Sequence, residues 1–377
     1  MLEALCASRT AFAPYEPFRV AGLRVPIAAS VPDESFPASR FCASDDRGAR
    51  LLEAAVRDAL LDTCGAGDLS ALGGVAAARV ALVAGTSSSG VGPFCDSIRT
   101  GLPRAHDDTR YGSAASLVAR GLGVTGPVLT TCNVCASGAL AIAEAADLLC
   151  AGIVDAAIAV GFDPLEPFVA AGFDALGTLC EQPRPFRAGR RGFVLGEGAA
   201  ALVLSRSPQT VPSCRGVVLG WGSSSDAHHL TAPHPDGEGL MLAVQRALRC
   251  AGMGADDIDV INAHGTGTVY NDAMEAKAAT RVFGARTPRI PLYTVKGTTG
   301  HTLGAAGAIE AAVSLLAMRA GVIPPTVTQG DVDPACAVDL VVGSPRRVAT
   351  HATLSLSAGF GGANCALVLA PCPGETR

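Results

Sequence analysis

Residues 126–152, GPVLTTCNVCASGALAIAEAADLLCAG, place a predicted strand directly before a predicted helix. The β-rich run Gly126–Thr131 leads into Cys135, and the run after Gly138 is helix-forming and apolar on most of its faces. Free backbone N–H groups and the positive end of a helix dipole favour a thiolate at such a junction. Small residues follow the cysteine and leave room for a substrate, so Cys135 is the candidate nucleophile.

Two other interpretations of this stretch stay open. A cysteine before a buried helix is, taken alone, more often an ordinary core residue. Cys132 is a rival nucleophile, but it comes three residues earlier, where we expect it still to lie on the strand. The CxxC pair that the two cysteines form has no second CxxC or histidine pair to complete a zinc site, so we expect no metal.

The same strand–turn–helix style recurs along the chain and predicts a layered α/β fold with mostly buried sheets. Further strands are predicted at Arg79–Ala84, Ala156–Val160, Ala199–Leu204, Gly216–Gly220, Ile258–Ala263, Ile290–Val295, Asp339–Val342, Thr353–Ser357 and Cys365–Leu369. Helices are predicted at Arg50–Leu61, Leu240–Ala251 and Ala305–Ala320. The polar, proline-containing stretch Ser205–Ser213 falls between the two sets of elements and is a candidate connection between two halves.

Composition supports a large buried core. Of 377 residues, 49% are hydrophobic and 17% are charged, and the net charge of -5 gives no reason to expect nucleic-acid binding. The chain has no uninterrupted apolar run of about 18 residues, so we expect no membrane span. The N-terminus MLEALCASRTAF lacks the features of a secretory signal, and the 13 cysteines are mostly scattered without paired spacing. We therefore expect reduced thiols and a cytoplasmic protein.

A second motif, Asn262–Thr268 (NAHGTGT), follows the strand pattern IDVINA. Ligand crevices form at the carboxyl ends of strands in α/β proteins, which makes His264 a candidate site residue. Thr266 and Thr268 expose hydroxyls at two-residue spacing and suit the amide groups of a bound arm. A histidine that merely caps the strand is an equally common arrangement.

A third motif, Lys296–Gly307 (KGTTGHTLGAAG), precedes a helix pattern. His301 near the start of that helix meets the positive end of its dipole, which keeps the imidazole neutral and able to donate a hydrogen bond to a carbonyl oxygen. Lys296 and Lys277 are the only lysines in the chain. Lys296 is either a surface charge or, in these glycine-rich surroundings, a buried group, with Glu310 as its candidate partner.

A fourth motif, Ser357–Asn364 (SAGFGGAN), ends a strand in a glycine-rich loop. Glycines on both sides of Phe360 allow unusual dihedral angles and leave a backbone N–H free to point at an oxyanion. Phe360 either gates a hydrophobic pocket or simply packs. Together, in this order, the four motifs point to thioester chemistry.

From about Arg40 to its C-terminus the chain resembles the elongating β-ketoacyl-acyl-carrier-protein synthases of type II fatty-acid and polyketide pathways. The matching stretches are NVCASGALAI, RRGFVLGEGAA, TAPHPDGEGL, INAHGTGT, KGTTGHTLGAAGAIE and GFGGAN. The resemblance implies the thiolase fold, in which two α/β halves form a five-layered α/β/α/β/α sandwich that dimerises. We expect the halves at residues 1–211 and 212–377, with the nucleophile in the first and both histidines in the second.

The resemblance also implies a decarboxylative condensation. Cys135 would take an acyl group from a phosphopantetheine thioester, and His264 and His301 would stabilise the enolate formed when a malonyl thioester loses carbon dioxide. Backbone N–H groups of Cys135 and Phe360 would hold the oxyanion. A His301 at this position differs from the Asn of initiating synthases and the Cys of thiolases.

Other motif positions carry supporting roles by the same resemblance. Lys296 and Glu310 match positions that organise the histidines, Thr266 and Thr268 match those that hold the pantetheine arm, and the substrate-binding loop includes Gly361 and Gly362. The implied partners are acyl carrier protein and a second subunit, as a homodimer or a heterodimer. No metal or redox cofactor is implied.

The chain also departs from the family. Relatives usually begin with a strand of the type VVVTG, whereas this chain begins at what resembles the helix after it, so we expect a first half without its usual first strand. Arg187 and Arg191 replace residues that are commonly acidic. A non-catalytic subunit resembling a chain-length factor is the main alternative, although such subunits typically lack the nucleophile. A Cys/His thioester hydrolase would leave one histidine and the lysine idle, and acyl length and pathway stay open.

Overall fold

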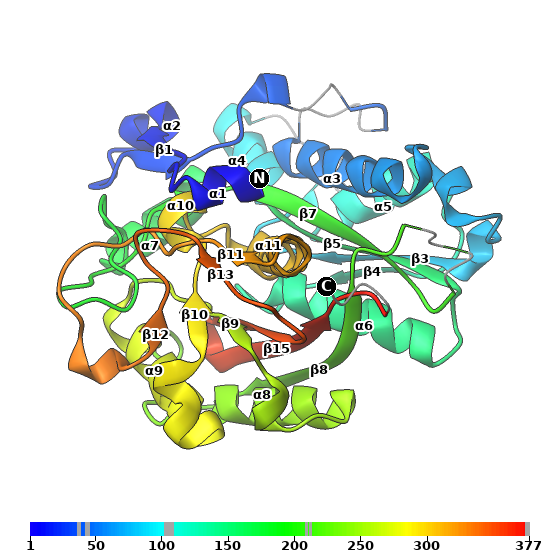
Figure 1. Ribbon diagram of the computed structural model, residues 1–377. Helices are drawn as coiled ribbons and strands as arrows, with labels where there is room; N and C mark the ends of the chain where they lie inside the picture. Colours follow the sequence, from blue (N-terminus) through cyan, green and yellow to red (C-terminus); the bar gives the residue numbers. More distant parts are fainter. Residues whose placement is uncertain (36–38, 42–45, 102–108, 208–209, 211–212, 374–377) are drawn as a thin grey trace.

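A computed structural model describes the chain from residue 1 to 377 except residues 36–38, 42–45, 102–108, 208–209, 211–212 and 374–377 (Figure 1). Two large sheets form its centre. Strands of the first sheet come from residues 80–205, and those of the second from residues 217–370. The expected boundary at residues 211 and 212 falls outside the described residues, so the division into two halves there stays a proposal.

The first sheet has the order β4 (Val128–Thr131), β3 (Val80–Gly85), β5 (Ala156–Asp163) and β7 (Gly198–Ser205). Strand β3 pairs in parallel with β4 and β5, and β7 runs antiparallel to β5 over its whole length. Every residue of β3 and β5 is buried, as the uninterrupted runs VALVAG and AAIAVGFD predict for central strands.

The second sheet repeats this order and adds a strand at each end. Its strands, in spatial order, are β12 (Asp339–Leu340), β10 (Pro291–Tyr293), β9 (Val260–Asn262), β14 (Thr353–Gly359), β15 (Ala363–Ala370) and β8 (Val217–Ser225). Strand β9 pairs in parallel with β10 and β14, while β14 and β15 form an antiparallel hairpin. Strand β8 closes the far edge, antiparallel to β15.

Helices form three layers around the two sheets. Helices α6 (Ser137–Cys150) and α11 (Ala306–Ala320) lie between the sheets and pack on both, and Figure 1 shows α11 nearly end-on between them. Helices α3 (Arg47–Cys64) and α5 (Ser113–Leu122) cover the outer face of the first sheet, and α8 (Glu238–Ala251) and α9 (Val269–Phe283) that of the second. The architecture is therefore the expected five-layered α/β/α/β/α sandwich.

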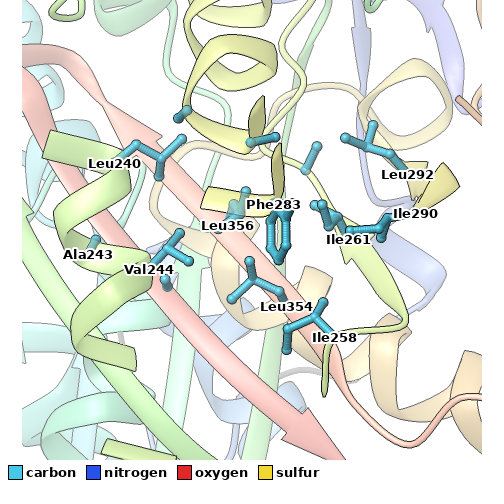
Figure 2. Close-up of a cluster of buried hydrophobic side chains, with 14 of the residues drawn as sticks. Leu240, Ala243, Val244, Ile258, Ile261, Phe283, Ile290, Leu292, Leu354 and Leu356 are labelled. Atoms are coloured by element: carbon cyan, nitrogen blue, oxygen red, sulfur yellow. The ribbon is translucent and has the colours of Figure 1, made fainter. Parts of the chain in front are cut away.

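Apolar side chains fill each space between layers. Figure 2 shows the cluster beneath the second sheet, where Leu240 and Val244 of α8 and Phe283 of α9 meet Leu354 and Leu356 of β14. All five are at most 6% exposed. Such burial is worth about 1.5–3 kcal/mol for each large side chain and makes this layer a stable base for the loops above it.

Short elements complete the chain. The remaining helices and strands are α1 (Leu2–Cys6), α2 (Glu16–Val20), α4 (Val91–Thr100), α7 (Pro167–Ala175), α10 (Lys296–Thr299), β1 (Phe12–Pro14), β2 (Ile27–Ala29), β6 (Leu195–Gly196), β11 (Val322–Ile323) and β13 (Arg346–Arg347). Among the described residues, the first sheet has no strand on the far side of β7. This agrees with the expectation of a first half that lacks one strand.

Two expectations about cysteines need correction. Cys214 and Cys372 form a disulfide across a sequence separation of 158 residues, so the expectation that all thiols are reduced is wrong for this pair. Cys132 lies one residue beyond β4 and is exposed, rather than on the strand. The sequence could not reveal the disulfide, because folding alone brings such distant residues together.

One segment passes a composition test for membrane crossing. Leu303–Ala320 is 18 residues long with a mean hydropathy of 1.4, and 72% of it is buried inside the protein. It contains α11, and its apolar residues pack between the two sheets. Burial on this scale is the pattern of a core helix in a layered fold.

Candidate active site

Cys135 lies in a strained turn between β4 and α6. Val134, directly before it, has φ +51°, a conformation that β-branched residues rarely adopt. Ser137 stabilises the turn, because its hydroxyl accepts from the backbone N–H of Asn133 at 2.8 Å and donates to the carbonyl oxygen of Val134 at 2.6 Å. Strain of this kind persists only where the surroundings over-determine it, and here it fixes the position of the Cys135 side chain.

The starts of α6 and α11 approach each other closely beside this turn. A Cβ atom on Gly138 would lie 2.7 Å from the carbonyl oxygen of Gly304 and 2.9 Å from the backbone nitrogen of Ala308. Only glycine fits at such a contact. The contact between the two helices therefore brings Cys135, before α6, towards His301, before α11.

Cys135, His264 and His301 form one buried cluster. A sulfur or ring-nitrogen atom from each lies within 4.8 Å of those of the other two. The two imidazole rings are 5.2 Å apart between centroids at an interplanar angle of 80°. Relative exposures are 4% for Cys135 and 2% for each histidine, so water is largely excluded from the cluster.

Hydrogen bonds indicate which nitrogen of each imidazole carries the proton. Nδ1 of His301 accepts from the backbone N–H of Leu303 at 3.2 Å, and Nδ1 of His264 lies 3.2 Å from Nζ of Lys296, which carries only donors. In a neutral imidazole whose Nδ1 accepts, the proton is on Nε2. The cluster therefore offers two N–H donors, one from each ring.

Both imidazoles are neutral at ordinary pH. Burial lowers the pKa of His264 well below its usual value, and the nearby Lys296 and His301 lower it further. Burial, followed by the charge of Lys296, lowers the pKa of His301 in the same way. Each ring can thus donate a hydrogen bond without first releasing a proton from an imidazolium.

Lys296 and Glu310 form a buried ion pair behind His264. Their side chains are 2% and 1% exposed, and Nζ of Lys296 donates to Oε1 of Glu310. Burial raises the pKa of Glu310 to about 7, although Lys296 opposes the rise. Of the two interpretations of Lys296, surface charge or buried group, the second is correct, and the expected pairing with Glu310 is present.

The thiol of Cys135 is protonated at rest. Burial raises its pKa to about 12, more than the charge of Lys296 and a hydrogen bond from the backbone N–H of Phe360 can lower it. The expectation of a resting thiolate from the helix dipole is therefore wrong, because the sequence gives no measure of desolvation. The proton must leave during the reaction.

The glycine-rich loop after β14 lies against the cysteine. A Cβ on Gly359 would lie 3.1 Å from the backbone nitrogen of Cys135, so the two backbones nearly touch. Gly361 and Gly362 have φ +74° and +78°, and hydrogen bonds link Gly361 to the carbonyl oxygen of Leu230 and Gly362 to the N–H of Asp226. This backbone brings the N–H groups of Cys135 and Phe360 to one side of the sulfur.

An aromatic group surrounds this loop. The ring of Phe360 lies 5.7 Å from that of Phe173, which lies 5.5 Å from Phe193, and Phe193 in turn lies 5.0 Å from the ring of His301. Phe360 itself is half-buried. Its backbone meets the cysteine while its ring joins an apolar wall, which suits a gate and also fits simple packing.

Thr266 and Thr268 lie on the His264 loop. Their hydroxyl oxygens are 3.0 Å apart, with Thr266 buried and Thr268 half-buried. Paired hydroxyls at the rim of a buried cluster can hydrogen-bond to a polar chain that enters it. Their role in holding such a chain stays a proposal.

Sequence reasoning missed the acids that hold the His264 loop. Glu275 of α9 accepts from the backbone N–H groups of His264 at 2.7 Å and Gly265 at 2.6 Å, and burial raises its pKa to about 8. Asp272 accepts from the N–H groups of Phe186 at 2.7 Å and Gly267 at 3.1 Å. A signal was present, since both acids lie in the segment NDAMEAKAA, where small and apolar residues predict a buried face.

Two further residues were missed. Buried Asp163 accepts from the backbone N–H groups of Ser87 and Gly304 at 2.9 and 2.6 Å, and so ties the first half to the turn before α11. Arg190, 5% exposed, donates to the carbonyl oxygens of Thr268 and Val269. The expectation for this segment concerned Arg187 and Arg191 and overlooked the buried arginine between them.

The three clustered atoms could also hold a metal ion by distance alone. Structural zinc sites use four ligands, and catalytic ones use three protein ligands with an open position. A histidine that binds a metal uses one nitrogen and donates through the other. Here both Nδ1 atoms accept or face a cation, which fits hydrogen-bond donation through Nε2 better than metal binding.

Comparisons with known proteins agree with this geometry. Residues 36–210 match the family model described as beta-ketoacyl synthase, N-terminal domain, and residues 215–329 match that of the C-terminal domain. The chain is 37% identical over 267 residues to a curated 3-oxoacyl-[acyl-carrier-protein] synthase 2 of Coxiella burnetii, a match that covers 68% of this chain and 64% of that relative. The matched stretch thus spans slightly less than two thirds of the relative's length.

Solved structures match over more of the chain. A beta-ketoacyl synthase from Burkholderia phymatum superposes with a TM-score of 0.86 at 30% identity, covering 98% of this chain and 94% of that one. The ishigamide ketosynthase/chain length factor superposes with a TM-score of 0.85 at 29% identity and the same coverage. These likenesses cover both large sheets and the middle helices.

Proposed function

This chain belongs to the β-ketoacyl synthase family and has the thiolase fold, and from that premise we propose that it condenses an acyl thioester with malonyl-acyl-carrier protein to give a 3-oxoacyl-acyl-carrier protein. The observation that carries the proposal is the buried cluster of one thiol and two imidazoles, each with its Nε2–H free to donate. The pathway is fatty-acid or polyketide biosynthesis.

Acyl transfer comes first. The sulfur of Cys135 attacks the carbonyl carbon of an acyl group on phosphopantetheine, a new sulfur–carbon bond forms, and the old thioester bond breaks. The thiol proton, which burial retains at rest, ends on the departing pantetheine sulfur. The two backbone N–H groups of Cys135 and Phe360 hold the oxyanion.

Decarboxylation follows. The thioester carbonyl oxygen of the malonyl group accepts hydrogen bonds from Nε2–H of His264 and His301. When the bond to the carboxylate breaks and carbon dioxide leaves, the electron pair passes into an enolate whose oxygen the same donors stabilise. Lys296 and Glu310 keep His264 in the required tautomer and orientation.

Condensation completes the cycle. The enolate carbon attacks the acyl-cysteine carbonyl, the carbon–sulfur bond to Cys135 breaks, and the cysteine recovers a proton from solvent. Thr266 and Thr268 hydrogen-bond to the pantetheine amides while Gly361 and Gly362 leave space for the chain. The phosphopantetheine of the carrier protein supplies the only prosthetic group, and no metal or separate cofactor takes part.

The partners are acyl carrier protein and a second ketosynthase-like subunit. Strand β4 ends the first sheet among the described strands, and its Val128 and Leu129 are 36% and 39% exposed. An exposed apolar edge of this kind suits pairing between subunits. The similarity to a ketosynthase/chain length factor supports a heterodimer as the finer alternative to a homodimer. We place the enzyme in the cytoplasm.

The proposal is tested with purified protein, acylated carrier protein and malonylated carrier protein. We expect release of carbon dioxide and a 3-oxoacyl-carrier product, measured by trapped carbon dioxide and by mass spectrometry. If neither forms, with the protein alone or together with a chain-length-factor subunit, the catalytic proposal is wrong. An acyl-length series in the same assay would identify the accepted chain.

A further inference from the structure

The two large sheets differ at corresponding edges. In the second sheet β15 lies between β14 and β8, whereas in the first sheet β7 pairs with β5 on one side and with no described strand on the other. All eight residues of β15 are buried, but in β7 only Gly198 is, and the other seven are half-buried. Strand β7 therefore occupies the place of β15 without a counterpart of β8.

A groove of about 690 Å³ runs along this open edge. Its walls come from β7, from α3 on one side, and from α6 and α11 on the other. Apolar side chains and small residues form most of its surface; representative ones are Ala59, Leu149, Leu202, Leu204, Leu315 and Leu316. The groove thus joins free main-chain hydrogen-bonding groups to an apolar floor.

We propose that this groove is a strand-acceptor site, which binds an extended segment of a partner polypeptide antiparallel to β7. A strand added to a sheet edge gains main-chain hydrogen bonds from the edge and specificity from pockets for alternate side chains. An uncovered apolar edge is also a site of aggregation, so covering it stabilises the protein.

Strand β8 shows what chemistry the segment should have. It runs antiparallel to β15, and Gly220 and Gly222 allow the backbone of α8 to approach so closely that added Cβ atoms would lie 2.4 and 2.3 Å from carbonyl oxygens. Val218 and Trp221 of β8 pack against the apolar cluster of the middle layer. By analogy, the segment carries small residues towards α3 and larger apolar residues towards α11.

The segment comes from outside residues 1–377. Every described strand already has a place in a sheet, and the longest stretch outside the described residues, 102–108, is shorter than the eight-residue β7. A partner chain is therefore the source that supplies a strand of matching length.

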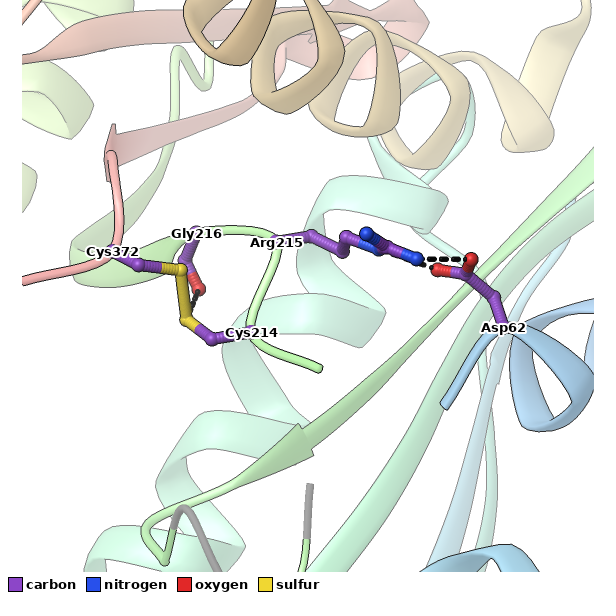
Figure 3. Close-up of a disulfide and its surroundings, with 5 residues drawn as sticks. All are labelled: Asp62, Cys214, Arg215, Gly216 and Cys372. Carbon is purple, nitrogen blue, oxygen red and sulfur yellow. Dashed lines mark hydrogen bonds and ion pairs between the residues drawn. A yellow bond between two sulfur atoms is a disulfide. The ribbon is translucent and has the colours of Figure 1, made fainter. Parts of the chain in front are cut away.

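The wall beside the groove is cross-linked and does not need to form on binding. Figure 3 shows the disulfide between Cys214 and Cys372 next to the ion pair between Arg215 and Asp62, whose closest atoms are 2.6 Å apart. These contacts tie the segment before β8 to the C-terminal end and to α3. Such preorganisation lowers the entropy lost on binding.

The test uses the full chain and a fluorescent peptide with the sequence of residues 216–225, GVVLGWGSSS, which performs this role beside β15. We expect saturable binding by fluorescence anisotropy, and hydrogen exchange at residues 198–205 slowed on the order of tenfold. A peptide in which Leu219→Pro blocks strand pairing should neither bind nor slow exchange, whatever the stability of any protein variant.

A matched pair of protein variants locates the site. Leu316→Arg places a charge in the groove and should weaken peptide binding on the order of tenfold, while Leu176→Arg, at another exposed leucine outside the groove, should leave it unchanged. The proposal is overturned if the peptide does not bind, or if it binds without slowing exchange in β7. It is also overturned if β7 becomes protected with rising protein concentration alone, because a second copy then covers the edge.

Discussion

Two corresponding turns, one in each half of the molecule, carry different chemistry. Strand β4 leads through Cys135 into α6, and strand β10 leads through His301 into α11. Both helices lie in the middle layer and meet where a Cβ on Gly138 would lie 2.7 Å from the carbonyl oxygen of Gly304. The same strand–turn–helix unit therefore delivers a nucleophile from one side of the site and a hydrogen-bond donor from the other.

Burial acts in opposite directions on these two groups and leaves both uncharged. It raises the pKa of the Cys135 thiol to about 12 and lowers the pKa of the His301 imidazole well below its usual value. The site at rest thus holds a neutral thiol and neutral donors, with the charges confined to Lys296 and Glu310 behind them. Catalysis in such a site depends on positioned donors more than on resting ions.

The largest expected effect is on the nucleophilic turn. Cys135→Ala should reduce acyl transfer by at least about 10⁴-fold, because no other group in the cluster can form the thioester. Intact-mass measurement after incubation with acyl carrier protein should show no acyl adduct, while Cys132→Ala should acylate normally. An undiminished mass shift in Cys135→Ala would assign the nucleophile to another cysteine.

The donor turn should respond differently. His301→Ala removes one of two donors to the malonyl carbonyl and should slow decarboxylation by about 10²–10³-fold while acylation of Cys135 persists. Separate assays of carbon dioxide release and acyl-enzyme formation measure the two steps. Equal loss of both would contradict the division of labour between the two turns.

The ion pair behind the turns can be separated from the donors. Lys296→Met leaves Glu310 buried without its cation and should lower the free energy of unfolding by about 3–5 kcal/mol. Adding Glu310→Gln should restore much of that stability without restoring activity, since His264 still lacks its partner. Urea unfolding gives the comparison, and full stability of Lys296→Met would show that the pair is not needed for the fold.

The smallest effect concerns pH. Because burial lowers the pKa of both histidines, neutral donors persist below pH 6.5, and the decarboxylation rate should change by less than about twofold between pH 7.5 and 6 once Glu310 is removed as a titrating group. Glu310→Gln is needed as the background, since the pKa of Glu310 is about 7. Half-loss of rate near pH 6.5 in that variant would show imidazoles with ordinary pKa values.

The sequence predicted most of the frame. Continuous apolar runs such as VALVAG located the buried strands, with ends that differ by one to three residues from those observed for β3 and β5. Glycine-rich motifs after strands located Cys135, His264 and His301, because site loops follow strand ends in this class of fold.

What the sequence could not predict depends on tertiary packing. The protonated thiol of Cys135 follows from how completely other segments bury it, and the Cys214–Cys372 disulfide joins residues that are distant in sequence. Glu275 acts through backbone N–H groups of a separate loop, and side-chain patterns do not reveal those partners. The lack of a strand was foreseen by resemblance, but the apolar groove beside β7 was not.

The central claim is that one turn carries the acyl group while the other drives decarboxylation, and one measurement tests it directly. Malonylated carrier protein is given to Cys135→Gln and to the double variant Cys135→Gln/His301→Ala, and carbon dioxide release is followed. We expect release without condensation from the single variant and little release from the double variant. No release from Cys135→Gln, or equal release from both, would contradict the account.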